Sequence, residues 1–209
     1  MSNRSIHTLL KNWDEECPLT REEAVEVLNL PEEEMDSLME CAYALRTKYK
    51  GKKVSVQLLT NVRSGNCTQN CAYCAQSKDS QAEIEKYKRV SDEKLYGDND
   101  LVDEKHLARH CIGLSGIGFS DEEIEDLADR IREMKKKDTQ ICCSIGFLTE
   151  KQARILKDAG LDRINHNLNS SRFFYPEICT THTYDQRVNN IKMLQSLGFE
   201  ICSGGIVGM

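Results

Sequence analysis

From residue 53 onward, segments with the two-residue alternation of a β-strand take turns with segments of helical period. The strand-like segments are rich in β-branched and other apolar residues, and they cover residues 53–61, 108–116, 139–147, 161–168 and 199–208. The helical segments between them cover residues 121–137, 150–160 and 183–198. Strands that alternate with short helices form right-handed βαβ units and a parallel sheet. The pattern therefore predicts an α/β fold.

Capping boxes mark where two of these helices begin. Ser120 stands three residues before Glu123, ahead of the helix predicted at 121–137, and Thr149 stands in the same way before Gln152. Residues 75–100 are polar, and we expect a loop with a short helix there. Local sequence alone thus places most of the element boundaries.

The first 50 residues are predicted to be helical. Thr20 and Glu23 form a further capping-box sequence, Pro31 suits the start of a helix, and Gly51 suits a helix end. We expect two domains: an N-terminal helical cap over residues 1–50 and a (β/α) barrel over residues 51–209.

The polar and thiol residues of the second segment lie near the predicted ends of its strands, where (β/α)₈ TIM-type barrels carry their chemistry. Eight strands need about 250 residues, and the chain ends after its fifth predicted strand. The expected fold is therefore a TIM-type barrel truncated after about five strands. Its unpaired edge predicts that residues 1–209 alone are poorly soluble or inactive.

Composition excludes some partners. The chain is 39% hydrophobic and 30% charged with a net charge of −6, so it lacks the basic surface that nucleic acid requires. No apolar run has the length of a membrane span, and the N-terminal stretch lacks the apolar region of a signal peptide. We expect a cytoplasmic protein with neither a membrane nor a nucleic-acid partner.

Ten cysteines in a reducing compartment indicate metal or redox chemistry where they cluster. We interpret Cys17, Cys41 and Cys179, which stand apart, as buried apolar residues.

The stretch SGNCTQNCAYCAQS, residues 64–77, holds Cys67, Cys71 and Cys74 within eight positions. Structural zinc prefers four ligands, usually as two pairs, and ferredoxin-type clusters use four cysteines in other spacings. Four irons held by three thiolates leave one iron open for an exogenous ligand. The triplet is therefore typical of a cluster that binds a further molecule.

C-x₃-C-x₂-C with Tyr73 before its last cysteine is the signature of radical S-adenosylmethionine enzymes, and GNCTQNCAYCAQS closely resembles the biotin synthase family. The resemblance continues in order through CIGLSG, ICCSIGFLTEKQARILKDAGLDRINHNLNSS, TTHTYDQRVNNI and CSGGIVGM, across roughly residues 50–209. It implies that Cys67, Cys71 and Cys74 ligate a [4Fe–4S] cluster that binds S-adenosyl-L-methionine.

The resemblance also implies an auxiliary iron–sulfur cluster held by Cys111, Cys142 and Cys202, with Arg109 beside it. One thiol from each of three strands can converge inside a barrel. Cys143 alternates to the opposite face from Cys142, which we prefer as the ligand. CIGLSGIGF departs from the family's Met-Gly-Ala-Ala-Trp, so the auxiliary cluster is left as [2Fe–2S] or larger.

Further site residues follow from the resemblance. Asn165 and Asn167 would bind the ureido group of dethiobiotin, because an amide offers both a donor and an acceptor. Asn169 replaces the family's aspartate and can still bond a ribose hydroxyl. The residues implied for S-adenosylmethionine are Tyr73, Asn167, Asn169, Arg187, whose guanidinium would clamp the carboxylate, and Ile206 of the glycine-rich GGIVG. His166 alternates away from its neighbours, and we expect it to be structural.

The implied reaction converts dethiobiotin to biotin by radical insertion of sulfur from the auxiliary cluster, with a flavodoxin- or ferredoxin-type electron donor. A homodimer is compatible with this assignment. Two alternatives stay open. Another radical S-adenosylmethionine enzyme, such as a hydrogenase-maturation enzyme, would keep the triplet without the second trio. A non-enzymatic zinc or iron–sulfur binding module would need a fourth local ligand.

Overall fold

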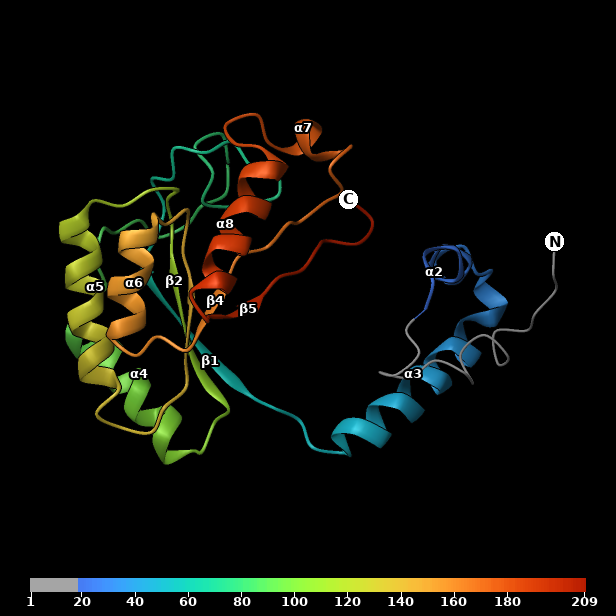
Figure 1. The fold of residues 1–209 in the computed structure, drawn as a ribbon, viewed down its shortest axis with the longest axis horizontal. Coiled ribbons are helices and arrows are strands. Elements are labelled where there is room, and N and C mark those ends of the chain that lie inside the picture. The colour runs from blue at the N-terminus through green and yellow to red at the C-terminus, as the bar shows by residue number, and fades with distance from the viewer. Residues whose placement is uncertain (1–18) are drawn as a thin grey trace. The chain divides into compact units, whose positions relative to one another are not determined.

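The computed structural model describes residues 19–209, so Cys17 lies outside the described part (Figure 1). The chain divides into two compact units, Met1–Val54 and Ser55–Met209.

In the first unit, the expected helix signals are confirmed. Helix α2 (Arg21–Leu28) begins at Thr20, which forms the predicted capping box with Glu23. A 3₁₀ turn, η1 (Glu32–Glu34), follows Pro31, and α3 (Met35–Lys50) ends at Gly51, whose φ of 62° suits a glycine. Cys41 on α3 is half-buried, so the expectation of a fully buried thiol is wrong there.

The second unit is built on five parallel strands whose spatial order is their order in the chain. They are β1 (Gln57–Arg63), β2 (Arg109–Leu114), β3 (Ile141–Ser144), β4 (Arg163–Asn165) and β5 (Glu200–Cys202). The predicted α/β class is confirmed. β1 and β5 are the two edges of this sheet, which is an open arc of a (β/α) barrel.

Each crossover between strands carries a helix. These helices are α4 (Asp92–Glu104), α5 (Asp121–Met134), α6 (Glu150–Asp158) and α8 (Tyr184–Ser196), and the short α7 (Tyr175–Ile178) precedes α8. Figure 1 shows α4, α5, α6 and α8 along one side of the sheet. Helix α4 is longer than the polar sequence indicated, and α7 was not predicted.

The hydrophobic core lies between the sheet and these helices. Ile112, Ile141 and Ile164 come from the strands, and all three are fully buried. From the helices, Ile124 and Leu156 pack into the same cluster. Because one face of each strand is used in this way, the alternate residues of β2, β3 and β4 face the interior of the arc.

Side-chain caps fix where the helices begin. The capping boxes predicted at Ser120 and Thr149 are both present, and a third, at Thr183, opens α8. Each satisfies backbone N–H groups that a helix start leaves without partners. Each of these helices therefore begins at a defined residue. The fixed helix starts help to position the strand ends described below.

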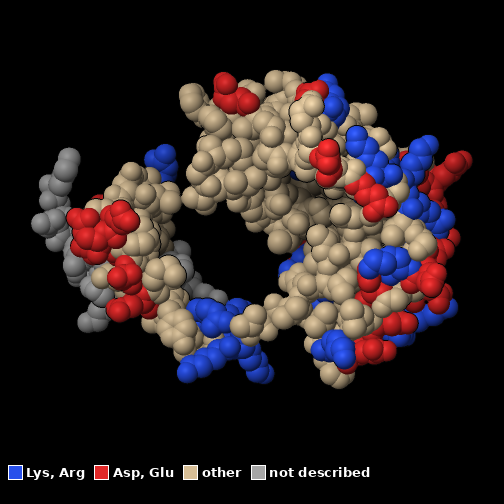
Figure 2. All heavy atoms as spheres, turned by 180° about the vertical axis from the view of Figure 1, so that it is seen from behind, with Lys and Arg blue, Asp and Glu red and all other residues tan. Residues whose placement is uncertain are grey.

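Charged side chains of both signs are intermingled over the outer helices of the second unit (Figure 2). Several pair across neighbouring elements, such as Lys151 with Asp121 at 2.6 Å and Lys137 with Asp100 at 2.6 Å. Within residues 19–209, no helix combines the length and the apolar character that crossing a bilayer requires.

Candidate active site

A cavity of about 240 Å³ opens where the carboxyl ends of β2, β3 and β4 meet the cysteine loop. It contains the first three predicted cluster ligands and most of the residues implied for the cofactor and substrate. These are Cys67, Cys71, Tyr73, Cys74, Asn165, Asn167, Asn169 and Arg187. Parallel strands present their carboxyl ends at one edge, and this explains why residues from distant segments share one cavity.

The cysteine loop after β1 is held by hydrogen bonds to its own backbone. Gly65, at a φ of 70°, donates its N–H to the side-chain oxygen of Gln76 (2.7 Å). Lys78 donates its backbone N–H to the carbonyl of Gln69 (2.9 Å), and the Ser77 hydroxyl bonds the same carbonyl. These hydrogen bonds close the loop into a compact turn, and its three cysteines line the cavity.

The three thiols of this loop do not all lie within 4.8 Å of one another. Four thiolates around one zinc lie about 3.8 Å apart, given Zn–S bonds of about 2.3 Å. Within residues 19–209, ligand atoms lying within 4.8 Å of one another occur in one trio only, which contains Cys71 but neither Cys67 nor Cys74. The loop thus suits a multi-iron cluster better than structural zinc.

Cys71 itself is nearly buried, at 7% exposure. Burial, reinforced by the neighbouring Cys179, raises the pKa of its thiol to about 12. Iron would displace that proton outright, as metals do with coordinating thiols. Cluster loading is therefore coupled to proton release at this residue.

Asn169 joins the cysteine loop to the chain after β5. Its side-chain amide donates to the Tyr73 hydroxyl (2.6 Å), and its backbone N–H bonds the carbonyl of Gly204 (2.9 Å). Ile206 donates its N–H back to the Asn169 carbonyl (2.8 Å). Three of the residues implied for S-adenosylmethionine, Tyr73, Asn169 and Ile206, are therefore physically linked.

Arg187 reaches the cavity from α8. Its Nε donates to the Tyr175 hydroxyl (2.6 Å), and its terminal NH₂ group donates to His182 Nε2 (3.0 Å). The guanidinium also lies over the Phe147 ring, 5.8 Å from the ring centre. These contacts fix one edge of the planar guanidinium, a suitable arrangement for binding a carboxylate.

Asn165 and His166 are at the end of β4. Among the described residues, the buried side-chain oxygen of Asn165 has no hydrogen-bond partner, as expected of a group that awaits a ligand. His166 also lines the cavity and packs edge-on against Phe147, so the expectation that it points away is wrong. Burial and the Arg187 charge lower the pKa of His166 to about 4, so the ring is neutral at pH 7.

Cys111 and Cys142 are direct cross-strand neighbours on β2 and β3. Arg163 of β4 continues the same row, opposite Cys142, and Glu200 of β5 follows it. Cys202 is two residues further along β5, opposite Asn165. Cys111 and Cys142 of the predicted auxiliary trio thus lie on adjacent strands, whereas β4 separates them from the exposed Cys202, which is two residues nearer the cavity end.

Cys143 is fully buried in the hydrophobic core, on the face opposite to Cys142. Strand alternation had predicted this separation of the two adjacent thiols. Burial, reinforced by the neighbouring Cys111, raises the pKa of Cys142 to about 12, although the charges of Arg109 and Arg163 oppose the shift.

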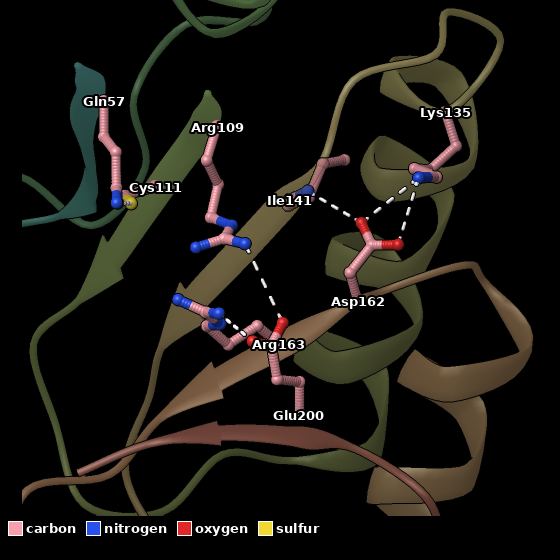
Figure 3. A network of polar contacts seen from close by, with 8 residues as sticks. All are labelled: Gln57, Arg109, Cys111, Lys135, Ile141, Asp162, Arg163 and Glu200. Carbon is pink, nitrogen blue, oxygen red and sulfur yellow. Dashed lines mark hydrogen bonds and ion pairs between the residues drawn. The ribbon is translucent and has the colours of Figure 1, made fainter. Parts of the chain in front are cut away.

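Arg109 of β2 and Arg163 of β4 extend beside Glu200 (Figure 3), and the charges of both arginines act on the thiols of Cys111 and Cys142. Arg109 and Arg163 both pair with Glu200, Arg109 at 3.7 Å. Each nevertheless retains a buried Nε without a partner among residues 19–209. Donor-rich, positive surroundings fit an anionic iron–sulfur group bound by the three thiols.

Cys179 and His182 are the site residues that sequence reasoning missed. Cys179 was interpreted as a buried apolar thiol, and it is indeed only 4% exposed. Its sulfur, however, lies 3.7 Å from Cys71 Sγ and 3.2 Å from His182 Nδ1. Burial lowers the pKa of His182 to about 4, together with the Arg187 charge. The sequence contained no local signal for this contact, because 108 positions separate the two cysteines.

Comparison with known proteins matches residues 61–209 to the family model described as the radical SAM superfamily. The chain belongs to this superfamily. A [4Fe–4S] cluster and S-adenosylmethionine are therefore its implied cofactors, and a cavity lined by the thiols of Cys67, Cys71 and Cys74 and by the Arg187 guanidinium fits them.

Curated relatives of this radical SAM chain include the biotin synthases of Geobacillus kaustophilus, 40% identical over 192 residues, and of Bacillus subtilis, 41% identical over 192 residues. Each alignment covers 91% of this chain. The chain spans only 58% and 57% of those two relatives, respectively.

Solved structures confirm the fold. A maturase of the [FeFe]-hydrogenase matches with a TM-score of 0.81 at 17% identity, covering all of this chain and 47% of the maturase. Methylornithine synthase also matches at 0.81, with 16% identity over 96% of this chain and 58% of that enzyme. At such identities the likeness concerns architecture only.

Proposed function

We propose that this radical SAM chain is the cluster-binding part of a biotin synthase, which converts dethiobiotin to biotin by inserting sulfur. The observation that carries the proposal is the pair of thiols at Cys111 of β2 and Cys142 of β3, which lie side by side on the interior of the arc. Cys202 lies on β5, which β4 separates from β3. Two partly unpaired arginines face them. The identity of about 40% with curated biotin synthases supports it.

In this proposal, Cys67, Cys71 and Cys74 hold the [4Fe–4S] cluster at the mouth of the cavity. The cluster and S-adenosylmethionine supply, when bound, a carbon-centred radical that can abstract hydrogen from an unactivated carbon. Arg187 would hold the carboxylate of S-adenosylmethionine, because Tyr175 and His182 already orient its guanidinium. Tyr73, Asn169 and Ile206 would surround the nucleoside, with the Asn169 amide near the ribose.

Asn165 and Asn167 would orient dethiobiotin between the two iron–sulfur sites. Both line the cavity at the end of β4. The unpartnered Asn165 oxygen would accept a hydrogen bond from a ureido N–H, and an Asn167 amide would complete the contact. Placing the substrate above the row of Cys111 and Cys142 brings its carbon chain toward the sulfur source.

The auxiliary group, [2Fe–2S] or larger, would be held by Cys111, Cys142 and Cys202. Arg109 and Arg163 would stabilise its negative charge through the nitrogens that now lack partners. A flavodoxin- or ferredoxin-type protein would supply electrons.

Anaerobic reconstitution tests this proposal. Because residues 1–209 alone are expected to be poorly soluble or inactive, the chain is completed to the full length of its curated relatives, loaded with iron and sulfide, and given S-adenosylmethionine, a reductant and dethiobiotin. We expect 5′-deoxyadenosine, methionine, and either biotin or a thiolated intermediate. Formation of 5′-deoxyadenosine with neither sulfur product would contradict the substrate assignment and favour another radical SAM activity.

Adjacent cysteines offer a matched control for the auxiliary site. Cys142→Ala should remove the auxiliary iron and the sulfur product, while 5′-deoxyadenosine still forms. Cys143→Ala removes a thiol on the opposite face, so iron content should stay at the wild-type value even if stability falls. Iron and sulfide analysis and Mössbauer spectra provide the readout. Equal iron loss in both variants would mean that the trio is not a ligand set.

A further inference from the structure

Cys71 and Cys179 are brought together by two loops that are bonded to each other. Ala72 donates its backbone N–H to the carbonyl of Ile178 (2.9 Å), one residue beyond Cys71 and one before Cys179. The Asn70 amide donates to the Thr180 hydroxyl (2.7 Å), and its oxygen accepts the Thr180 N–H (3.0 Å). The two cysteines are thus flanked on both sides by direct bonds between their loops.

The two sulfurs lie 3.7 Å apart, and both side chains are nearly buried, at 7% and 4% exposure. A disulfide requires S–S contact at about 2.05 Å. Closing the remaining gap requires the two side chains to rotate toward each other while the hydrogen bonds between their loops persist.

His182 does not make this trio a good cation site. Its Nε2 accepts from Arg187, and its Nδ1 lies 3.1 Å from the Gln69 side-chain oxygen and 3.2 Å from Cys179 Sγ. Both ring nitrogens are therefore engaged. The Arg187 guanidinium would also repel a metal ion bound beside the ring.

We propose that Cys71 and Cys179 form an intramolecular disulfide when the chain lacks its cluster and meets a peroxide. One of the two sulfurs attacks the peroxide, which breaks the O–O bond and gives a sulfenic acid and water. The neighbouring thiol then attacks that sulfur, forms the S–S bond and releases a second water. Two thiols are oxidised by two electrons in total, and one hydrogen peroxide is reduced to two waters.

The consequence is protection of a cluster ligand. A sulfenic acid without a nearby thiol goes on to sulfinic acid, which is irreversible for most proteins. With Cys179 at 3.7 Å, the sulfenic acid is resolved to a disulfide that an added thiol can reduce. While this bond persists, Cys71 cannot ligate iron, so cluster loading would wait for reduction.

Peptide mapping of the cluster-free chain tests the proposal. The chain is treated with a small excess of hydrogen peroxide, because sulfinic acid consumes two peroxides per thiol; its remaining thiols are alkylated, and it is digested without reductant for mass spectrometry. We expect a linked peptide pair that joins Cys71 to Cys179. Cys179→Ser and Cys71→Ser should both lose this pair, and the variant that keeps the thiol attacked first by peroxide should accumulate sulfinic acid there, several-fold above wild type. Cys41→Ser, which changes a thiol of the other unit, should retain the pair.

Linkage of Cys71 to Cys67 or Cys74, or equal sulfinic acid in wild type and in both single variants, would overturn the proposal. Circular dichroism of each variant before oxidation shows that the compared chains are folded. A second arm measures cluster uptake: oxidised wild type should take up iron only after dithiothreitol is added. The mapping requires no biotin formation, so it can fail or succeed separately from the proposed function.

Discussion

At the scale of single residues, Asn169 combines a strained backbone with a bond across the site. Its φ of 65° lies in the left-handed region, which asparagine tolerates better than most residues. Its side chain is buried and donates to Tyr73. One position therefore serves the turn after β4 and the wall of the cavity.

Glycine and alanine at position 169 separate these two roles. Asn169→Gly removes the amide but permits the backbone, so we expect a loss of about 1 kcal/mol in the free energy of unfolding. Asn169→Ala removes the amide and adds strain, so its loss should be larger by about 1–2 kcal/mol. Denaturant unfolding of both variants measures the difference, and equal losses would show that the backbone conformation costs alanine nothing.

His110 is a second buried residue with a measurable consequence. Its ring contacts the Thr60 hydroxyl (2.9 Å) and the Asn99 side-chain oxygen (3.2 Å). Burial lowers its pKa to about 4; the nearby Asp98 opposes this shift and Lys94 supports it. The ring is therefore neutral in the folded chain at pH 7.

This depressed pKa predicts a loss of stability in mild acid. In the unfolded chain the histidine binds a proton below pH 6.5, whereas the folded chain resists protonation down to about pH 4. Stability is thus fully present above pH 6.5 and falls by up to about 1.4 kcal/mol per pH unit below it. Unfolding of wild type and His110→Gln at pH 7.5 and 5.5 tests this. The variant should show the shallower pH dependence, and parallel curves would contradict the assignment.

At the scale of elements, the loops after β2 and β3 are packed against each other. Phe147 donates its N–H to the carbonyl of Ile117 (2.7 Å). A Cβ added at Gly146 would lie 2.4 Å from that same carbonyl oxygen. The contact is between two backbones, so neither partner can move aside by changing a rotamer.

Gly146→Ala should therefore separate the two loops and destabilise the chain by about 1–3 kcal/mol. Gly118 is the matched control, because a Cβ there would meet nothing within 4 Å. Thermal unfolding should show a lower midpoint for Gly146→Ala and a nearly unchanged one for Gly118→Ala. Since Gly146 lines the cavity, S-adenosylmethionine binding by calorimetry should weaken in parallel. Similar midpoints for both variants would refute the close-packing explanation.

At the scale of the whole molecule, the second unit contains its own hydrophobic core. Every member of the main buried cluster, from Val62 to Phe199, belongs to Ser55–Met209. We therefore expect the sheet and its helices to form their core from residues of the second unit alone.

A chain beginning at Ser55 should keep one cooperative unfolding transition, with a midpoint close to that of residues 1–209. Far-UV circular dichroism during heating provides the measurement, and loss of the transition would show that the first unit supports the core. Iron bound per chain after reconstitution is the accompanying control, because the thiols of the cavity and of β2 and β3 are all retained.

The sequence by itself determined the features that depend on neighbours a few residues apart. Period-two and helical patterns predicted the five strands and five of the helices, and capping boxes at Thr20, Ser120 and Thr149 predicted where three helices begin. The cysteine triplet indicated the superfamily, because its spacing is local. The full length of α4 could not be predicted, because the helix has few buried residues and its sequence is therefore mostly polar.

Only the tertiary structure decided which distant groups meet. Strand register set Cys111 beside Cys142 and placed Arg163 next in the row. Loop-to-loop bonding set Cys179 against Cys71 across 108 positions, where no sequence period connects them. Sequence patterns report interactions within one helical turn or one strand. Contacts between residues far apart in the sequence depend instead on how the βα units pack against one another.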